Sequence, residues 1–382
     1  MLAAQVKFEG RAAEFVAELK ERVDAYFEGS GRSRHADWRM IARTISAFSL
    51  TFIPYALILS NRFSPWAMLV LAVVMGVGVA GIGFGVSHDA LHGAYSASPT
   101  VNRLMGYSFD LLGANGYLWK ITHNVIHHTY TNIQGIDEDL EVSPLLRLSP
   151  RSEWRPIHRI QPVFAFALYS LSTLFWVFAK DYKYFLQKNL GPYKEKKHPP
   201  QEIAILIAGK VLYYTWSLVI PFLVVQVAWW QFAIGYVAMH LTAGLILGVV
   251  FQLAHVVEGA EHLAPDTGGR MDAAWMVHQM RTTSDFSTGS KLLTWYVGGL
   301  NYQVEHHLFP RVCSIHYPAI RPILRQGAAK YGVPYHEQPT LWAAIRSHYH
   351  MLKELSRPPR PAYASGGERE AGGHAPSRAR GP

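Results

Sequence analysis

The sequence predicts an all-α integral membrane protein, with about four transmembrane helices in two hairpins and a histidine-rich helical cap on the cytoplasmic side. Apolar residues make up 49% of the 382-residue chain and charged residues only 16%, whereas soluble domains average about 25% charged residues. Four apolar segments are long enough to cross a hydrocarbon core of about 30 Å. Most of the 19 histidines lie outside these four segments.

Residues 1–40 are expected to form a cytoplasmic amphipathic segment. Apolar side chains such as Phe15, Leu19 and Val23 recur there at helical spacing, with charged residues between them. This pattern predicts a helix that lies on the membrane or on the rest of the protein. We do not expect a signal peptide, because charged residues interrupt the first apolar run.

The membrane domain is expected over residues 41–355, with spans at about 41–60, 66–87, 203–228 and 232–254. The second span is rich in glycine, which would let another helix approach closely. Residues 163–179 are apolar but short, and we interpret them as an interfacial or re-entrant element. Residues 356–382 are dominated by Pro, Gly, Ala and Arg, and we expect a disordered tail.

The distribution of positive charge predicts the orientation in the membrane. Arg62 is the only lysine or arginine in the two outer turns, whereas the loops on the other face are rich in both residues. Positively charged loops are typical of the cytoplasmic side, and every histidine cluster falls on that face. We therefore expect a multi-pass protein with cytoplasmic histidines, in the inner membrane of a bacterium or the endoplasmic reticulum of a eukaryote.

Charge and cysteine content exclude several classes of protein. The net charge of +9 suits anionic lipid head groups, and the sequence contains no recognisable nucleic-acid module, so no nucleic-acid partner is expected. The single cysteine, Cys313, excludes a disulfide scaffold and a cysteine-based zinc module.

Two histidine clusters occur in the first half of the chain. His88 and His92 follow the second span, and His123, His127 and His128 lie further along. On an α-helix with 3.6 residues per turn, residues four apart share a face. His88 and His92 are therefore expected to face the same way, as are His123 and His127, whereas His128 would point about 100° away.

A third cluster joins His306 and His307 to Gln303, one helical turn earlier, and His255 stands alone after the fourth span. Neutral imidazole suits Fe, Zn, Cu or Ni, and this number of ligands exceeds a single tetrahedral zinc site. The clusters therefore predict two metals, with an adjacent pair such as His306–His307 giving one ring to each. Chemistry with O2 would favour iron. Each cluster alone could be a surface feature, and His255 could simply end a helix.

We predict other roles for several histidines outside the three clusters and His255. His240 lies within the fourth span, where we expect a hydrogen bond between helices. His278 is left as a possible metal ligand. We interpret the others considered as ordinary surface or local residues: His262, His316, His336, His348, His350 and His374.

The three clusters resemble the histidine boxes of membrane fatty-acid desaturases in order and spacing. The matching stretches are His88-Asp-Ala-Leu-His92, His123-Asn-Val-Ile-His127-His128 and Gln303-Val-Glu-His306-His307, and Phe251-Gln-Leu-Ala-His255 resembles the segment that gives an additional ligand. The likeness runs from about residue 40 to about residue 345. Gln303 in place of a first histidine resembles the front-end subgroup, with its linoleoyl-CoA-type delta-6 and delta-5 enzymes, which insert a double bond between an existing one and the carboxyl end.

The resemblance implies a di-iron centre with eight histidine ligands and Gln303 as a ligand or as a residue that supports one. Asp89 and Glu305 adjoin ligands and could orient them, although each could equally be a solvated surface charge. The implied iron ligands are His88, His92, His123, His127, His128, His255, His306 and His307.

The implied function is an O2-dependent desaturase that introduces a cis double bond into a long-chain acyl-CoA or acyl-lipid. The sequence lacks the His-Pro-Gly-Gly motif of a fused cytochrome b5 domain, so the two electrons are expected from ferredoxin or from free cytochrome b5 with its reductase. One alternative is a membrane di-iron fatty-acyl or sphingolipid hydroxylase. A remote alternative is a metal transporter, whose ligands would lie near the bilayer midplane.

Overall fold

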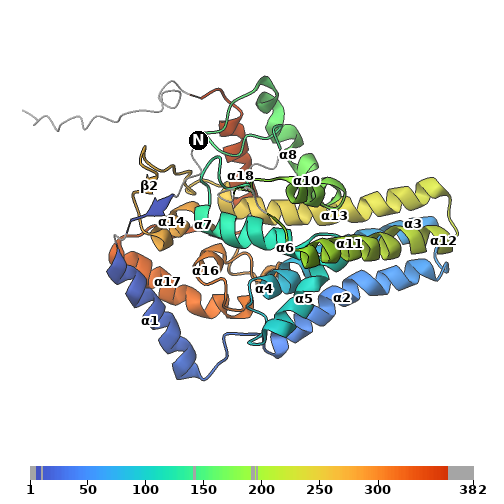
Figure 1. The fold of residues 1–382 in the computed structure, drawn as a ribbon, viewed down its shortest axis with the longest axis horizontal. Helices are drawn as coiled ribbons and strands as arrows, with labels where there is room; N and C mark the ends of the chain where they lie inside the picture. Colours follow the sequence, from blue (N-terminus) through green and yellow to red (C-terminus); the bar gives the residue numbers. More distant parts are fainter. Residues whose placement is uncertain (1–5, 10–11, 141–142, 191–193, 195–196, 360–382) are drawn as a thin grey trace, which may run out of the picture.

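The computed structural model describes residues 6–9, 12–140, 143–190, 194 and 197–359. It is mostly helical, and four helices are long and apolar enough to cross a membrane (Figure 1): Trp38–Leu59, Pro65–Leu91, Pro200–Val224 and Trp229–His255. Each begins and ends within four residues of a predicted span. The predicted all-α membrane fold with four spans in two hairpins is therefore confirmed.

Two of these helices are continuous α-helices, α2 (Trp38–Leu59) and α13 (Trp229–His255), and two contain a π-helical turn. The second span joins α3 (Pro65–Ile82), the π-turn η1 (Gly83–Ser87) and α4 (His88–Leu91), and the third joins α11 (Pro200–Tyr214), the π-turn η5 (Thr215–Val219) and α12 (Ile220–Val224). Polar caps fix where the first hairpin begins and turns. The Asp37 carboxylate accepts a hydrogen bond from the amide of Arg39 at 2.8 Å, and Ser64 caps α3 directly before a proline.

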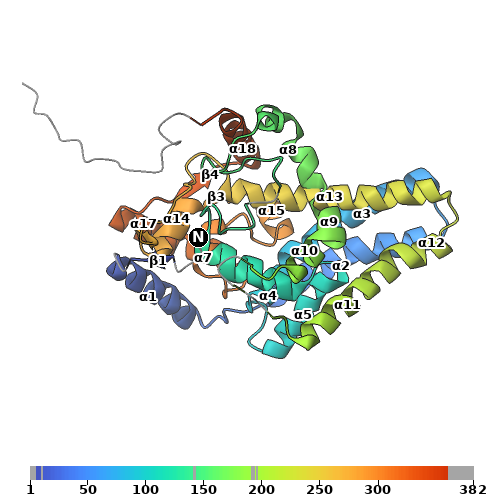
Figure 2. The same cartoon turned by 45° about the horizontal axis from the view of Figure 1, so that its top comes forward.

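The glycines of the second span allow α3 to lie against two neighbours at once. A Cβ atom on Gly76 would collide with the carbonyl oxygen of Met239 in α13, and one on Gly78 would collide with Thr51 in α2. The close approach predicted from the glycine-rich segment is therefore present on both sides of α3. It joins the two hairpins into one bundle, which runs to the right in Figures 1 and 2.

The remaining elements form a cap over one end of the bundle (Figures 1 and 2). Its helices in the first half of the chain are α1 (Ala13–Ser30), α5 (Pro99–Leu111), α6 (Gly116–Trp119), the π-turn η2 (Lys120–His127) and α7 (His128–Tyr130). Those in the second half are α14 (Trp275–Thr282), α15 (Lys291–Tyr296), α16 (Gln303–Leu308), the 3-10 turn η6 (Ser314–His316), α17 (Tyr317–Tyr331) and α18 (Leu341–Leu355). Two short parallel strand pairs complete it, β1 (Lys7–Phe8) with β2 (Arg270–Met271) and β3 (Ser284–Phe286) with β4 (His336–Gln338).

The amphipathic N-terminal helix packs on the protein. Phe15, Leu19 and Val23 of α1 are buried in one cluster with Ile320 and Leu324 of α17. Of the two surfaces considered for this helix, the structure thus selects the cap.

The segment around residues 163–179 is a bent pair of helices. It comprises the 3-10 turn η3 (Pro156–Ile160), α8 (Gln161–Ser170), α9 (Ser172–Phe175), the π-turn η4 (Trp176–Lys180) and α10 (Asp181–Leu186), with a bend of 57° between α8 and α9. Taken together, the two halves are long and apolar enough for either a broken span or a re-entrant element, so the interfacial or re-entrant interpretation stays a prediction. Residues 360–382, which include most of the predicted disordered tail, lie outside the described residues.

Candidate metal centre

Eight buried histidines meet where the second and fourth spans enter the cap. Ring nitrogens of His88, His92, His123 and His306 lie within 4.8 Å of one another, and so do those of a second group and of a third that links the first two. The second group is His127, His255 and His307, and the third is His128, His306 and His307. His306 therefore belongs to the first group, His307 belongs to the second, and both belong to the third. Linked groups of this kind fit two neighbouring metal ions.

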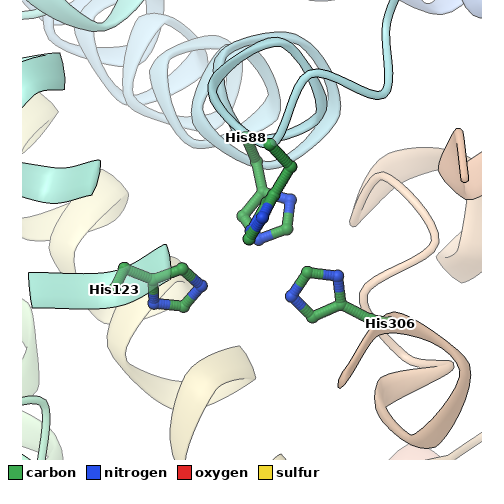
Figure 3. Close-up of side chains that lie close together, drawn as sticks. His88, His123 and His306 are labelled. Atoms are coloured by element: carbon green, nitrogen blue, oxygen red, sulfur yellow. The ribbon is translucent and has the colours of Figure 1, made fainter. Parts of the chain in front are cut away.

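The histidines come from segments that are far apart in the sequence. His88 opens α4 at the end of the second span, His123 lies in η2, and His306 lies in α16. Figure 3 shows the rings of these three residues pointing toward a common point. The fold therefore assembles the centre by tertiary packing of the boxes.

The second box is wound differently from the prediction. Residues Lys120–His127 form π-helical turns, in which residues five apart approach one another. The Nε2 atoms of His123 and His128 accordingly lie 3.3 Å apart. The expectation that His128 points away from His123 was wrong, because it assumed the 3.6 residues per turn of an α-helix.

Each of five rings has a partner for its Nδ1 atom, which orients the other nitrogen toward the centre. Carboxylates hold His123 and His127, since Nδ1 of His123 lies 3.0 Å from Asp139 and Nδ1 of His127 lies 3.0 Å from Asp137. The other acceptors are the side-chain oxygen of Gln279 for His307 at 2.8 Å, the carbonyl of Thr282 for His255 at 3.3 Å and the hydroxyl of Tyr317 for His306 at 3.2 Å. Such contacts are typical of metal-binding histidines.

The inward nitrogens have no hydrogen-bond partner in the part of the chain that the structure describes. The Nε2 atoms of His92, His127, His306 and His307 are buried in this state. The Nδ1–H group of His123 donates a hydrogen bond to Asp139, so its Nε2 atom carries a lone pair, and this atom faces the ring of His128. A buried polar atom without a partner costs about 1–3 kcal/mol. Metal ions at this point would satisfy all of these atoms, so the residues fit a metal centre.

The electrostatics keep most of these rings in the form that binds metal. Burial lowers the pKa of His123 to about 3, although Asp139 opposes the shift. Burial next to other imidazoles lowers the pKa well below its usual value for His92, His128, His306 and His307. Burial also acts on His127, but the Asp137 carboxylate outweighs it and raises the pKa. Neutral imidazole is the metal ligand, so the five rings whose pKa is lowered are in the form that binds metal.

Asp89 and Glu305 are both buried, so the alternative of a solvated surface charge was wrong. The Asp89 carboxylate accepts hydrogen bonds from the amide and hydroxyl of Ser314, at 3.0 and 2.8 Å. Another oxygen of Asp89 lies 3.7 Å from Nδ1 of His88, so this carboxylate connects the first box to the segment after the third. Glu305 accepts a hydrogen bond from the hydroxyl of Tyr335 at 2.7 Å.

Three further residues singled out from the sequence have defined polar contacts. Gln303 is buried in α16 and donates to the carbonyl of Leu300 at 2.6 Å. His278 lies in none of the three histidine groups, and its Nε2 contacts the carbonyl of Thr131 at 2.9 Å. His240 accounts for the predicted hydrogen bond between helices, because its ring contacts Tyr213 at 2.6 Å and Thr173 at 3.0 Å.

Two histidines interpreted as surface or local residues are in fact buried. His348 lies between the hydroxyl of Tyr169 and the carbonyl of Val256, at 3.0 and 2.8 Å. His316 contacts the carbonyl of His35 at 3.2 Å. The surface interpretation was wrong for both residues, because polar partners from segments far away in the sequence cover them. His374 lies outside the described residues.

Sequence reasoning missed the residues that hold the rings, above all Asp137 and Asp139. A signal was present, because this acidic pair follows the second box by about ten residues, within the histidine-rich segment. Gln279 and Tyr317 gave no comparable signal, since their pairing with the third box depends on how α14 and α17 pack against α16.

Comparison with known proteins identifies the family. A family model described as "Fatty acid desaturase" matches residues 64–339. The chain belongs to this family. An sn-1 linoleoyl-lipid 6-desaturase of Arthrospira platensis is 37% identical over 91% of this chain and 94% of its own length. A protein of the same description from Synechocystis sp. is 35% identical over 94% of this chain and 99% of its own length. An acyl-lipid (8-3)-desaturase of Physcomitrium patens is 34% identical over 90% of this chain and 72% of its own length.

The desaturase family and the front-end subgroup predicted from the boxes are therefore confirmed. The protein is a fatty acyl desaturase and hence an oxidoreductase, which favours this function over the hydroxylase and the transporter. Its four apolar helices make it a multi-pass membrane protein.

Proposed function

We propose that this desaturase uses two iron ions, O2 and two external electrons to insert a cis double bond into the acyl chain of a membrane lipid. The bond would lie between an existing double bond and the carboxyl end, at or near the delta-6 position. The names of the relatives support an acyl-lipid carrier and this position, since two of them are linoleoyl-lipid 6-desaturases. The CoA-linked substrate remains the alternative.

The observation that carries the proposal is the set of three linked groups of buried histidines. The proposed ligands are the seven histidines of the three boxes and His255, with Gln303 beside them. Asp137, Asp139 and Gln279 hold rings in place. Bound iron with O2 would supply the oxidation that removes two hydrogens from adjacent methylenes, which no acid–base group of a protein can achieve alone. His278 is kept as a possible contributor, although it makes no group with the others in the described part of the chain.

The protein's own residues bind, orient and shield the substrate. A cavity of about 450 Å³ lies among α2, α3, α12 and α13, and it is lined mainly by apolar side chains such as Ala72, Met75 and Met239. Met75 precedes His88 by 13 residues along one continuous helix, which is about 20 Å at 1.5 Å per residue. We assign this cavity to the methyl end of the acyl chain. Each methylene buried there contributes about 0.8 kcal/mol.

We further propose that the cap faces the cytoplasm. The turn between α2 and α3 contains one basic residue, Arg62, and the turn between α12 and α13 contains none. This distribution supports cytoplasmic boxes and a soluble electron donor, ferredoxin or free cytochrome b5 with its reductase. The membrane would be the inner membrane in a bacterium and the endoplasmic reticulum in a eukaryote.

Expression with a ferredoxin system in a host fed linoleate tests the proposal. Double bonds in the total lipids are located by derivatisation and mass spectrometry, beside His306→Ala and the exposed control His350→Ala. The expected result is a new bond on the carboxyl side of the existing one, absent only in His306→Ala. A hydroxylated product would replace the proposal with the hydroxylase. Purified protein without iron and without product would refute it.

A further inference from the structure

The carboxylates that hold His123 and His127 have different surroundings. Both oxygens of Asp137 lie near Nδ1 of His127, at 3.1 and 3.0 Å. Asp137 also accepts hydrogen bonds from the backbone amides of Asn132 and Asp139, at 3.0 and 3.1 Å. Within the described ranges, no lysine or arginine forms an ion pair with Asp137. The negative charge of this carboxylate is therefore directed at His127.

Asp139 divides its two oxygens between a histidine and a lysine. One oxygen lies 3.0 Å from Nδ1 of His123, and the other lies 3.6 Å from Nζ of Lys180. The side chains of Asp139 and Lys180 are only 11% and 15% exposed. Solvent screens such a pair less than it screens a surface pair, so the lysine charge acts strongly on this carboxylate.

Lys180 is held in place by its own neighbours. Its ammonium lies 4.2 Å from the ring centre of Trp176 and 5.4 Å from that of Tyr184, a favourable cation–π arrangement. The next residue, Asp181, forms a buried ion pair with Lys210 of α11 at 2.8 Å. The bent helix pair is thus fixed to the bundle at the point where it presents Lys180 to Asp139.

We propose that Lys180 makes the two metal positions electronically unequal, by drawing charge from Asp139 and so making His123 a weaker donor than His127. A carboxylate acceptor raises the basicity of a ligating imidazole, and a cation on the carboxylate reduces that effect. A metal in the group of His123 is then easier to reduce than one in the group of His127, because hydrogen bonding and charge around ligands set the potential. The first external electron would settle on the His123 side. This inference rests on the proposed two-iron function.

The test uses the full-length protein loaded with ⁵⁷Fe in detergent. Iron content, Mössbauer spectra and the two reduction steps of a redox titration are compared for the wild type, Lys180→Met, Lys180→Gln and Lys180→Arg. Lys183→Met is the matched control, since Lys183 is exposed and its ammonium lies over the same Tyr184 ring at 5.7 Å.

The wild type is expected to bind two irons with distinct signals. The two neutral variants should keep both irons, shift the first reduction step to lower potential and bring the two signals closer together. Lys180→Arg and Lys183→Met should resemble the wild type, which a purely structural role for Lys180 would not require.

Three outcomes would overturn the inference. The reduction steps could stay unchanged in the neutral variants, or Lys180→Arg could shift them as much as Lys180→Met does. Loss of iron from both neutral variants would mean that Lys180 retains the metal and does not tune it. A wild-type protein without iron would refute the proposed centre itself, and iron analysis reveals that failure before any titration.

Discussion

Nδ1 of His127 lies 3.0 Å from a carboxylate oxygen of Asp137, which is fully buried ten residues further along the chain. The contact fixes the ring so that its unpartnered Nε2 points at the other histidines of its group. Loss of a carboxylate that supports a metal-binding histidine typically weakens metal binding about 10- to 100-fold. Asp137→Asn is therefore expected to lower iron affinity by this factor, as measured by competition with a chelator.

The exposed carboxylate of Asp272 provides the control for this change. Its side chain is 68% exposed, and Asp272→Asn should leave iron affinity at the wild-type value. Equal affinities in Asp137→Asn and Asp272→Asn would show that Asp137 does not act on the metal.

The apolar cavity predicts a change in chain-length preference when its wall is filled. Ala72 lines the cavity, and it faces Gly235, whose Cβ position lies 3.9 Å away. Ala72→Phe should exclude the end of a long acyl chain, at a cost of about 0.8 kcal/mol for each methylene displaced, or roughly fourfold in kcat/KM per methylene. Feeding a series of fatty acids and quantifying the desaturated products measures this preference.

Val70 gives the matched control, because it is two residues away on the same helix and 63% exposed. Val70→Phe should point to lipid and leave the preference unchanged. The assignment of the cavity fails if Ala72→Phe desaturates the whole series as the wild type does.

The buried carboxyl of Asp110 predicts a pH-dependent stability. Burial raises its pKa from 3.8 to about 7, assisted by Asp181 of α10 and opposed by hydrogen bonds from Asn115 and Gly116. Between these values the folded protein keeps the proton and the unfolded chain has lost it. The free energy of unfolding therefore falls as pH rises through this window, by roughly 4 kcal/mol at most.

Asp110→Asn removes this term, because the amide does not ionise. Its Tm in detergent, relative to that of the wild type, should rise steadily from about pH 4 to about pH 7. The two proteins are compared in the same detergent over this range. Parallel Tm profiles would mean that Asp110 is already ionised in the folded protein.

The histidines at the centre could be predicted because imidazole side chains in clusters are themselves a sign of metal binding. The directions in which their rings point could not be predicted. The spans follow from length and apolar content alone, and these properties need no knowledge of the packing. The direction of His128 depends on the π-helical turns of η2, and such turns arise from tertiary contacts that local spacing does not contain. The same limit applies to His307 and Gln279, since 28 residues separate them and only the folded cap brings them together.

The glycines of α13 give a last pair of variants that separates helix packing from helix propensity. Gly244 faces the bent helix pair, and a Cβ atom there would collide with the backbone carbonyl of Ser170. Gly235 lies on the same helix, but its Cβ position has only ordinary contact, 3.9 Å from the Cβ of Ala72. Alanine favours a helix over glycine by about 1 kcal/mol at either position.

The packing at Gly244 should outweigh that gain, because backbone cannot move aside as a flexible side chain can. Gly244→Ala is therefore expected to lower the free energy of unfolding by about 1–3 kcal/mol, as is typical of overpacking. The Tm and the yield of folded protein should fall with it. Gly235→Ala should match or slightly exceed the wild type. Both are measured by thermal unfolding in detergent. A stable Gly244→Ala with full activity would contradict the close contact between α13 and the bent pair, on which the position of Lys180 beside Asp139 also depends.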